Sequence, residues 1–110
     1  MRYVDPNQPG SKVQFKAQYD NFIGGQWVAP VKGQYFENSA PVDGKVFTKV
    51  SRSSAEDIEL ALDAAHKAKA TWGQSSPTER SNILLKIADR LEANLETLAV
   101  AETWDNGKPI

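Results

Sequence analysis

Cysteine is absent from the 110-residue sequence, and histidine occurs once, as His66. Without cysteine, these residues can form no disulfide bond, no thiolate metal ligand and no thiol nucleophile. A single histidine likewise excludes a metal site built from several imidazoles. His66 lies near the end of a helical pattern, where an exposed or dipole-stabilised imidazole is the ordinary expectation. We therefore expect no catalytic role for it.

Long hydrophobic runs and an excess of one charge are also missing. No apolar stretch approaches the ~20 residues that cross a membrane, and the first residues lack the apolar core of a signal peptide. Thirteen Lys and Arg against fourteen Asp and Glu give a net charge of -1 without a block of like charge. These features argue against nucleic-acid and membrane partners and predict a cytoplasmic protein.

Glycine motifs that bind phosphate are missing as well. Neither Gly-x-Gly-x-x-Gly nor a complete P-loop occurs, and no serine lies in a Gly-x-Ser-x-Gly turn. The sequence therefore predicts no catalytic residue and no cofactor-binding residue within this chain.

Short apolar and aromatic runs separated by turn residues occupy the first half of the chain. Residues 1–20 carry two prolines and a glycine without a helical period, so they are expected to form an extended N-terminal arm or, alternatively, a mobile tail. A Gly-Gly pair within residues 21–28 favours a tight β-hairpin turn. Further short strands are expected at residues 34–38 and 45–50.

The hydrophobic period then changes from two to 3.6 residues, which predicts amphipathic helices. A first helix is expected from about Ser54 to Ala70, with a capping box formed by Ser53 and Glu56. Carboxylate pairs along the helices, Glu56 and Asp57 among them, are expected on faces exposed to solvent.

A second helix start follows at residues 76–79, where an N-cap serine, a proline and a glutamate occupy the first, second and fourth places. Asn94 is a possible break between two helices, and Gly107 with Pro109 supplies the stop. The apolar faces of these roughly three helices need a partner, yet the strands are too short to cover them. An incomplete domain is therefore expected.

Six segments resemble, in order and spacing, the opening of the NAD(P)-dependent aldehyde dehydrogenase superfamily. They are residues 21–28 (NFIGGQWV), 40–46 (APVDGKV), 57–65 (DIELALDAA), Trp72, Glu79-Arg80 and 102–109 (ETWDNGKP). The bacterial acetaldehyde dehydrogenase members are especially similar, through Pro9-Gly10, residues 19–22 and Trp104. The resemblance implies an α/β parent with a Rossmann-type cofactor domain, in which residues 21–110 form the incomplete N-terminal part.

The resemblance also implies an activity. The parent would oxidise an aldehyde, acetaldehyde or another short aliphatic one, to a carboxylate with NAD or NADP, and would be a dimer or tetramer. In this family a cysteine thiolate attacks the aldehyde, hydride passes to the nicotinamide, and glutamate-activated water hydrolyses the thioester. The family's cysteine, glutamate, oxyanion-hole asparagine and cofactor glycines lie downstream of the matching segment, so the chain alone is expected to be inactive.

Asp105 is the best candidate for a functional contact. A carboxylate at a helix C-terminus faces the negative end of the helix dipole and needs a cation or a donor to compensate. From the residues alone, an exposed helix end, a cation ligand and an anchor for the following loop all stay open. The resemblance implies that Asp105 and backbone carbonyls near Ser39 help to bind a structural K⁺ or Na⁺, for which oxygen ligands are suitable.

Two other kinds of protein are consistent with parts of this pattern. A non-catalytic interaction protein, or remnant, would use its exposed helix faces to bind a partner subunit. A free-standing enzyme is disfavoured because the necessary residue types are scarce. The isolated chain is expected to melt without cooperativity and to expose apolar surface to dyes.

Overall fold

In the computed structural model, which describes residues 2–110, four of the five strands follow the short runs that the sequence predicted. β2 and β3 form an antiparallel hairpin across Gly24 and Gly25, and both glycines adopt the expected positive φ. β4 pairs antiparallel with one edge of β5, and β1 pairs parallel with the other edge. The bounds are β1 Gln18–Tyr19, β2 Asn21–Ile23, β3 Gln26–Val28, β4 Tyr35–Ser39 and β5 Val46–Ser51.

The predicted N-terminal arm, whose first residue Met1 lies outside the described residues, runs onto the sheet. Val13 is buried, and the Phe15 ring packs 4.7 Å from the ring of Phe47. The Thr48 hydroxyl donates to the backbone oxygen of Lys16 at 2.7 Å. This hydrogen bond lies just before the first pair of the parallel β1–β5 ladder, Gln18 with Lys49. The arm therefore ends as a strand of the sheet, which the sequence did not predict.

Three helices complete the chain: α1 Ala55–Trp72, α2 Pro77–Ala93 and α3 Leu95–Asn106. The predicted start of α2 is confirmed, because the Ser76 side chain accepts the Glu79 N–H and the Glu79 carboxylate accepts the Ser76 N–H. Asn94 is the predicted break between α2 and α3. Gly107 ends α3 in the left-handed conformation at φ 79°.

The capping box expected for α1 at Ser53 and Glu56 is wrong by one residue. Ser54 is the N-cap, and the Asp57 carboxylate accepts its N–H at 2.8 Å. The other oxygen of Asp57 accepts the Val31 N–H at 2.9 Å, so a donor from a distant loop selects Asp57 instead of Glu56. Asp57 is consequently only 3% exposed, whereas the sequence placed it on a solvated face.

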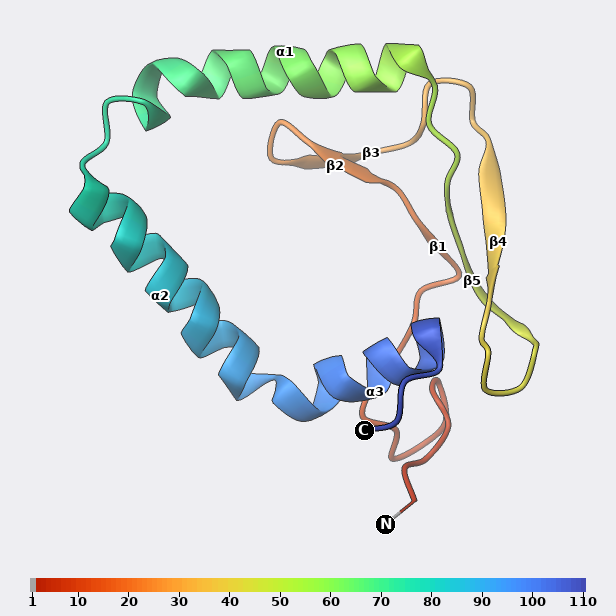
Figure 1. Cartoon of the computed structure of the whole chain (residues 1–110). Coiled ribbons are helices and arrows are strands. Elements are labelled where there is room, and N and C mark those ends of the chain that lie inside the picture. Colours follow the sequence, from red (N-terminus) through yellow and green to blue (C-terminus); the bar gives the residue numbers. More distant parts are fainter. Residues whose placement is uncertain (1) are drawn as a thin grey trace.

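The elements are arranged as a ring around an open centre (Figure 1). α1, α2 and α3 form consecutive sides, the strands form the remaining side, and the β2–β3 hairpin lies beneath α1. The radius of gyration is 17.4 Å, whereas a compact domain of this length has about 13 Å. The exposed area of 8479 Å² likewise exceeds the roughly 6,000 Å² of a compact protein of this mass. The helices of the described residues include none long and apolar enough to span a membrane.

Candidate functional site

Asp105 lies where the end of α3 meets β4. Asn38 Nδ2 donates to Asp105 Oδ1 at 2.8 Å, and Ser39 follows Asn38 at the end of the strand. This hydrogen bond offsets the unfavourable interaction between the Asp105 carboxylate and the negative end of the helix dipole. Gly107 holds the next turn close, since a Cβ there would be only 3.2 Å from Pro41 Cβ.

The loop after α3 is anchored by residues other than Asp105. The Thr103 hydroxyl donates to the Lys108 backbone oxygen at 2.6 Å, and the Lys108 N–H donates to Asn106 Oδ1 at 2.8 Å. Residues 2–110 contain no group of three or more His, Asp or Glu side chains that could hold a metal. A monovalent cation at Asp105 and Ser39 would thus need further oxygen ligands and stays a proposal.

Two other carboxylates make contacts that the sequence did not reveal. Glu96, in the first turn of α3, accepts the Tyr3 hydroxyl at 3.1 Å and lies 3.0 Å from Lys12 Nζ. The hydrogen bond from Lys12, then that from Tyr3, lowers the pKa of Glu96. Backbone N–H groups of Ser54 and Val31 lower the pKa of Asp57. The sequence offered no signal for either, because the arm and the loop lie far from the helices along the chain.

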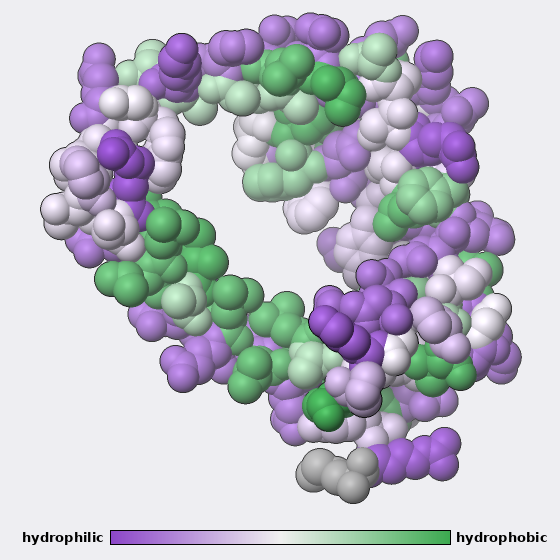
Figure 2. Space-filling view, viewed as in Figure 1, coloured by the Kyte–Doolittle hydropathy of each residue, from purple (hydrophilic) through white to green (hydrophobic). Residues whose placement is uncertain are grey.

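An apolar surface runs along α1 and α2. Figure 2 shows these apolar side chains gathered over α2 and part of α1. We call this set the arch surface; its exposed residues are Ile58, Leu62, Trp72, Ile83, Leu84, Ile87 and Leu91. His66, on the same helix as Trp72, is exposed as expected. Throughout α2 no residue is buried, so nothing in residues 2–110 covers its apolar side.

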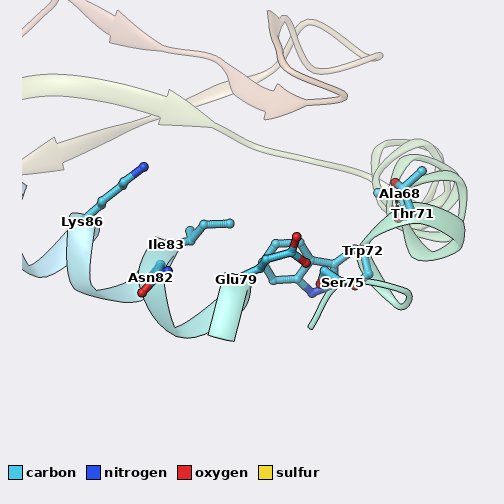
Figure 3. A pocket seen from close by; sticks show the side chains of 8 residues that line it. All are labelled: Ala68, Thr71, Trp72, Ser75, Glu79, Asn82, Ile83 and Lys86. Atoms are coloured by element: carbon cyan, nitrogen blue, oxygen red, sulfur yellow. Dashed lines mark hydrogen bonds between the residues drawn. The ribbon is translucent and has the colours of Figure 1, made fainter. Parts of the chain in front are cut away.

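Two open grooves follow the arch surface. One, of about 620 Å³, lies at the elbow between α1 and α2, where Trp72 stands beside Glu79 (Figure 3). The other, of about 410 Å³, continues toward α3, and Ile83 and Lys86 line both. Glu79 already accepts the Ser76 N–H. The grooves therefore offer mainly apolar contact and no arrangement of nucleophile and base.

Comparison with known proteins decides the family. The model of the aldehyde dehydrogenase family matches residues 27–110. The chain belongs to the aldehyde dehydrogenase family. A long-chain-aldehyde dehydrogenase from Acinetobacter sp is 79% identical over 110 residues, which are 100% of this chain and 22% of that protein. An acetaldehyde dehydrogenase from Pseudomonas aeruginosa is 61% identical over 110 residues, again 100% of this chain and 22% of that protein.

Solved aldehyde dehydrogenases share the fold of this chain. The NAD-dependent aldehyde dehydrogenase from Sinorhizobium meliloti superposes with a TM-score of 0.80 and 32% identity, over 98% of this chain and 22% of that one. The predicted fold class is therefore confirmed: the chain corresponds to an N-terminal segment of the α/β aldehyde dehydrogenase fold. It spans about a fifth of the length of the curated relatives it matches.

The starts of α1 and α2 in this aldehyde dehydrogenase segment do not fit the pyrophosphate of a dinucleotide. A pyrophosphate binds best at an uncapped helix N-terminus preceded by glycines. Here the first turns of α1 and α2 are occupied by the carboxylates of Asp57 and Glu79, which would repel phosphate. The glycines with positive φ lie in turns and at the end of α3 instead. We therefore assign no cofactor contact to residues 2–110.

Proposed function

We propose that this chain supplies the N-terminal arm, strands and helices of an NAD(P)-dependent aldehyde dehydrogenase, which oxidises an aldehyde to a carboxylate. We also propose that the chain is inactive by itself. The observation that carries the proposal is the arch surface, an uncovered apolar face in a chain that spans about a fifth of its relatives. The rest of such an enzyme is the partner that this face requires.

The amount of uncovered surface supports this role. The chain exposes roughly 2,500 Å² more than a compact protein of its mass. Permanent interfaces bury about 2,000–5,000 Å² counted over both partners, which is roughly 1,000–2,500 Å² on each, and they are more apolar than transient ones. The excess therefore has the size of a permanent interface, and the apolar side chains along α1 and α2 have its composition.

In this proposal, the groups that carry out the reaction belong to the rest of the enzyme. The sequence contains no cysteine, so the thiolate that attacks the aldehyde must come from the remainder of the enzyme. When bound, NAD or NADP accepts the hydride. The contribution of residues 1–110 is to hold the helices and the sheet against the domain that binds the cofactor.

Acetaldehyde or another short aliphatic aldehyde is our proposed substrate. The 61% identical relative from Pseudomonas aeruginosa, named an acetaldehyde dehydrogenase, supports this choice. A long-chain aldehyde is the second candidate, because the 79% identical relative from Acinetobacter sp is named for one. We further propose a cytoplasmic dimer or tetramer, with K⁺ or Na⁺ held in part by Asp105 and Ser39.

Purification with an antibody raised against residues 1–110 tests the proposal in source cells. We expect the antibody to retain a polypeptide several times heavier than 12.1 kDa that forms NADH or NADPH from aldehydes. A series of aldehydes of increasing chain length separates the two substrate candidates, and size-exclusion chromatography gives the oligomeric state. A 12.1 kDa polypeptide bound to a separate subunit, without aldehyde oxidation, would support the interaction protein instead.

A chimaera tests the structural part directly. Residues 1–110 would replace the matching 110 residues of the Acinetobacter relative, from which they differ at about a fifth of positions. We expect the chimaera to oxidise aldehydes with formation of NADH, and the 110-residue chain alone to give none above the blank. A folded but inactive chimaera would contradict the proposal, and so would turnover by the chain alone.

A further inference from the structure

One carboxylate fastens the N-terminal arm to the last helix. Tyr3 Oη donates to Glu96 Oε1 at 3.1 Å, and Lys12 Nζ lies 3.0 Å from Glu96 Oε2. The Lys12–Glu96 contact is the one ion pair found in the part of the chain that the structure describes. We call these three residues the arm clasp. It joins positions 93 residues apart, whereas the sequence predicted Glu96 only as a carboxylate on a solvent-exposed helix face.

The first part of the arm has few other attachments. Its remaining hydrogen bonds, within the described residues, stay inside the arm: the Asn7 N–H donates to the Val13 oxygen at 3.2 Å, and Ser11 N–H to the Gln8 oxygen at 3.0 Å. Val13 is the first buried residue of the arm, and pairing with the sheet begins after it. Residues 5–8 share an open pocket with Phe47 and Trp104. The clasp is therefore the polar fastening of residues 2–12 to the helices.

The two ends of α3 are held by different chemistry. Near its end, Asp105 accepts the neutral amide of Asn38, and Val100 between the two ends is 1% exposed. At its start, Glu96 is held by a full positive charge while the side chains of Lys12 and Glu96 are both 49% exposed. An exposed ion pair responds to salt and to protonation much more than buried apolar contact does.

We propose that the charge of Glu96 is a switch for the N-terminal arm. Ionised Glu96 fastens residues 2–12 to α3 and closes the ring beside the sheet. Neutral or screened Glu96 releases residues 2–12, while Val13 and the residues after it stay on the sheet. The proposal concerns the chain itself and does not depend on which aldehyde the parent enzyme oxidises.

The pH range of the switch follows from the groups around Glu96. Lys12 and Tyr3 of the arm are the charged and titratable groups that face it, and the hydrogen bond from Lys12 lowers its pKa. A lowered pKa means that the clasp is complete at neutral pH and opens as pH falls through that pKa. The hydrogen bond to Glu96 also raises the pKa of Tyr3, so ionisation of Tyr3 breaks that contact only at alkaline pH beyond the usual range of a tyrosine.

Limited trypsin digestion followed by mass spectrometry measures release of the arm. Trypsin cleaves after Lys12 and Lys16, and the second bond lies outside the clasp. When opening is fast, cleavage tracks the population of the open form. For Glu96→Gln at pH 7.5, we expect cleavage after Lys12 to rise about two- to fivefold, as for loss of one exposed ion pair. Cleavage after Lys16 should stay unchanged, because that residue remains on the sheet.

Glu92→Gln is the matched control, because it removes the same charge from the preceding helix without touching the arm. It should leave both cleavage rates unchanged. Added NaCl should speed cleavage of the wild-type chain and have little further effect on Glu96→Gln. Lys12→Met, read at the trypsin site after the exposed Arg2, gives a second variant with the same expected rise. Equal rates for Glu96→Gln and Glu92→Gln, or a salt effect of equal size in both, would overturn the proposal.

Discussion

The ring has two halves that differ in what they bury. The strand side consists of the arm, β1, β4, β5 and α3, and it contains the buried apolar residues Val13, Ala40 and Val100 together with Thr48. The arch consists of α1 and α2, where Asp57 at the first turn of α1 is the one buried residue among those described. Both halves have regular hydrogen-bonded backbone, but only the strand side has the beginning of a core.

This difference separates two requirements of a stable fold. Capping and helical periodicity are enough to specify where α1 and α2 begin and end, because these effects act within one helix. Stability requires apolar area removed from water, and Leu84 in α2 is still 66% exposed. We therefore expect the strand side to hold its structure independently of the rest of an aldehyde dehydrogenase, and the arch to depend on it.

The largest expected effect comes from Val100→Ala on the strand side. This substitution removes two methyl groups from a fully buried site, and comparable losses cost about 1–3 kcal/mol. Hydrogen exchange of α3 and β5 amides should accelerate by roughly tenfold or more. Leu85→Ala in the arch, where the side chain is 62% exposed, is the control and should change exchange little. If both substitutions accelerated hydrogen exchange equally, the strand side would have no more of a core than the arch.

Gly107→Ala should come next. An alanine in the left-handed conformation costs about 1–2 kcal/mol, and its Cβ would also approach Pro41 to 3.2 Å. Gly25→Ala carries the same backbone strain, but no atom lies within 4 Å of the place that its methyl group would take. Exchange of the last α3 amides should therefore increase more for Gly107→Ala than exchange of the β2–β3 amides does for Gly25→Ala. The reverse order would show that α3 is not tied to the strand side at this turn.

Asp57→Asn tests the junction between the halves. The N–H groups of Ser54, and then of Val31, lower the pKa of Asp57, so its stabilising effect is present at neutral pH and lost as pH falls through that lowered pKa. Exchange in the first turn of α1, corrected for the intrinsic pH dependence, should accelerate severalfold for Asp57→Asn at pH 7. Glu56→Gln, one residue earlier and exposed, should behave as the wild type. If the pH dependence of exchange persists in Asp57→Asn, a titratable group other than Asp57 causes it.

The smallest effect on the chain itself is expected for Leu84→Lys. Because the side chain is already 66% exposed, the stability of the isolated chain should change by less than about 0.5 kcal/mol. In the chimaera, the same lysine would be placed against the domain that covers the arch, and activity should fall sharply. Asp89→Asn, at an exposed position that lines neither groove, serves as a surface control in both settings. An active Leu84→Lys chimaera would show that the arch surface stays uncovered in the enzyme.

Local signals predicted most of the secondary structure. The serine-proline start of α2, the break at Asn94 and the left-handed Gly107 all depend on neighbouring residues, and the structure confirms each. The one-residue error at the start of α1 has a long-range cause, since the Val31 N–H selects Asp57. The parallel pairing of β1 with β5 escaped prediction for the same reason: no local pattern reports a partner more than 30 residues away.

The candidate site was predictable to a similar extent. The helix dipole marked Asp105 as a carboxylate in need of a partner, and Asn38 is that partner. The identity of the donor depends on how α3 meets β4, which the sequence pattern does not contain. The sequence did not indicate that Glu96 needs a partner. A carboxylate in the first turn of a helix is already stabilised by the helix dipole, with or without a contact from the arm.

The parallel pairing of β1 with β5 has a consequence for synthesis on the ribosome. The arm is synthesised before the rest of these residues, yet its strand cannot pair until Lys49 and Val50 have been made, and Glu96 is made later still. The β2–β3 hairpin and then α1 can form from neighbouring residues while the arm waits. Among residues 2–110, those synthesised first are thus among the last to reach their native places.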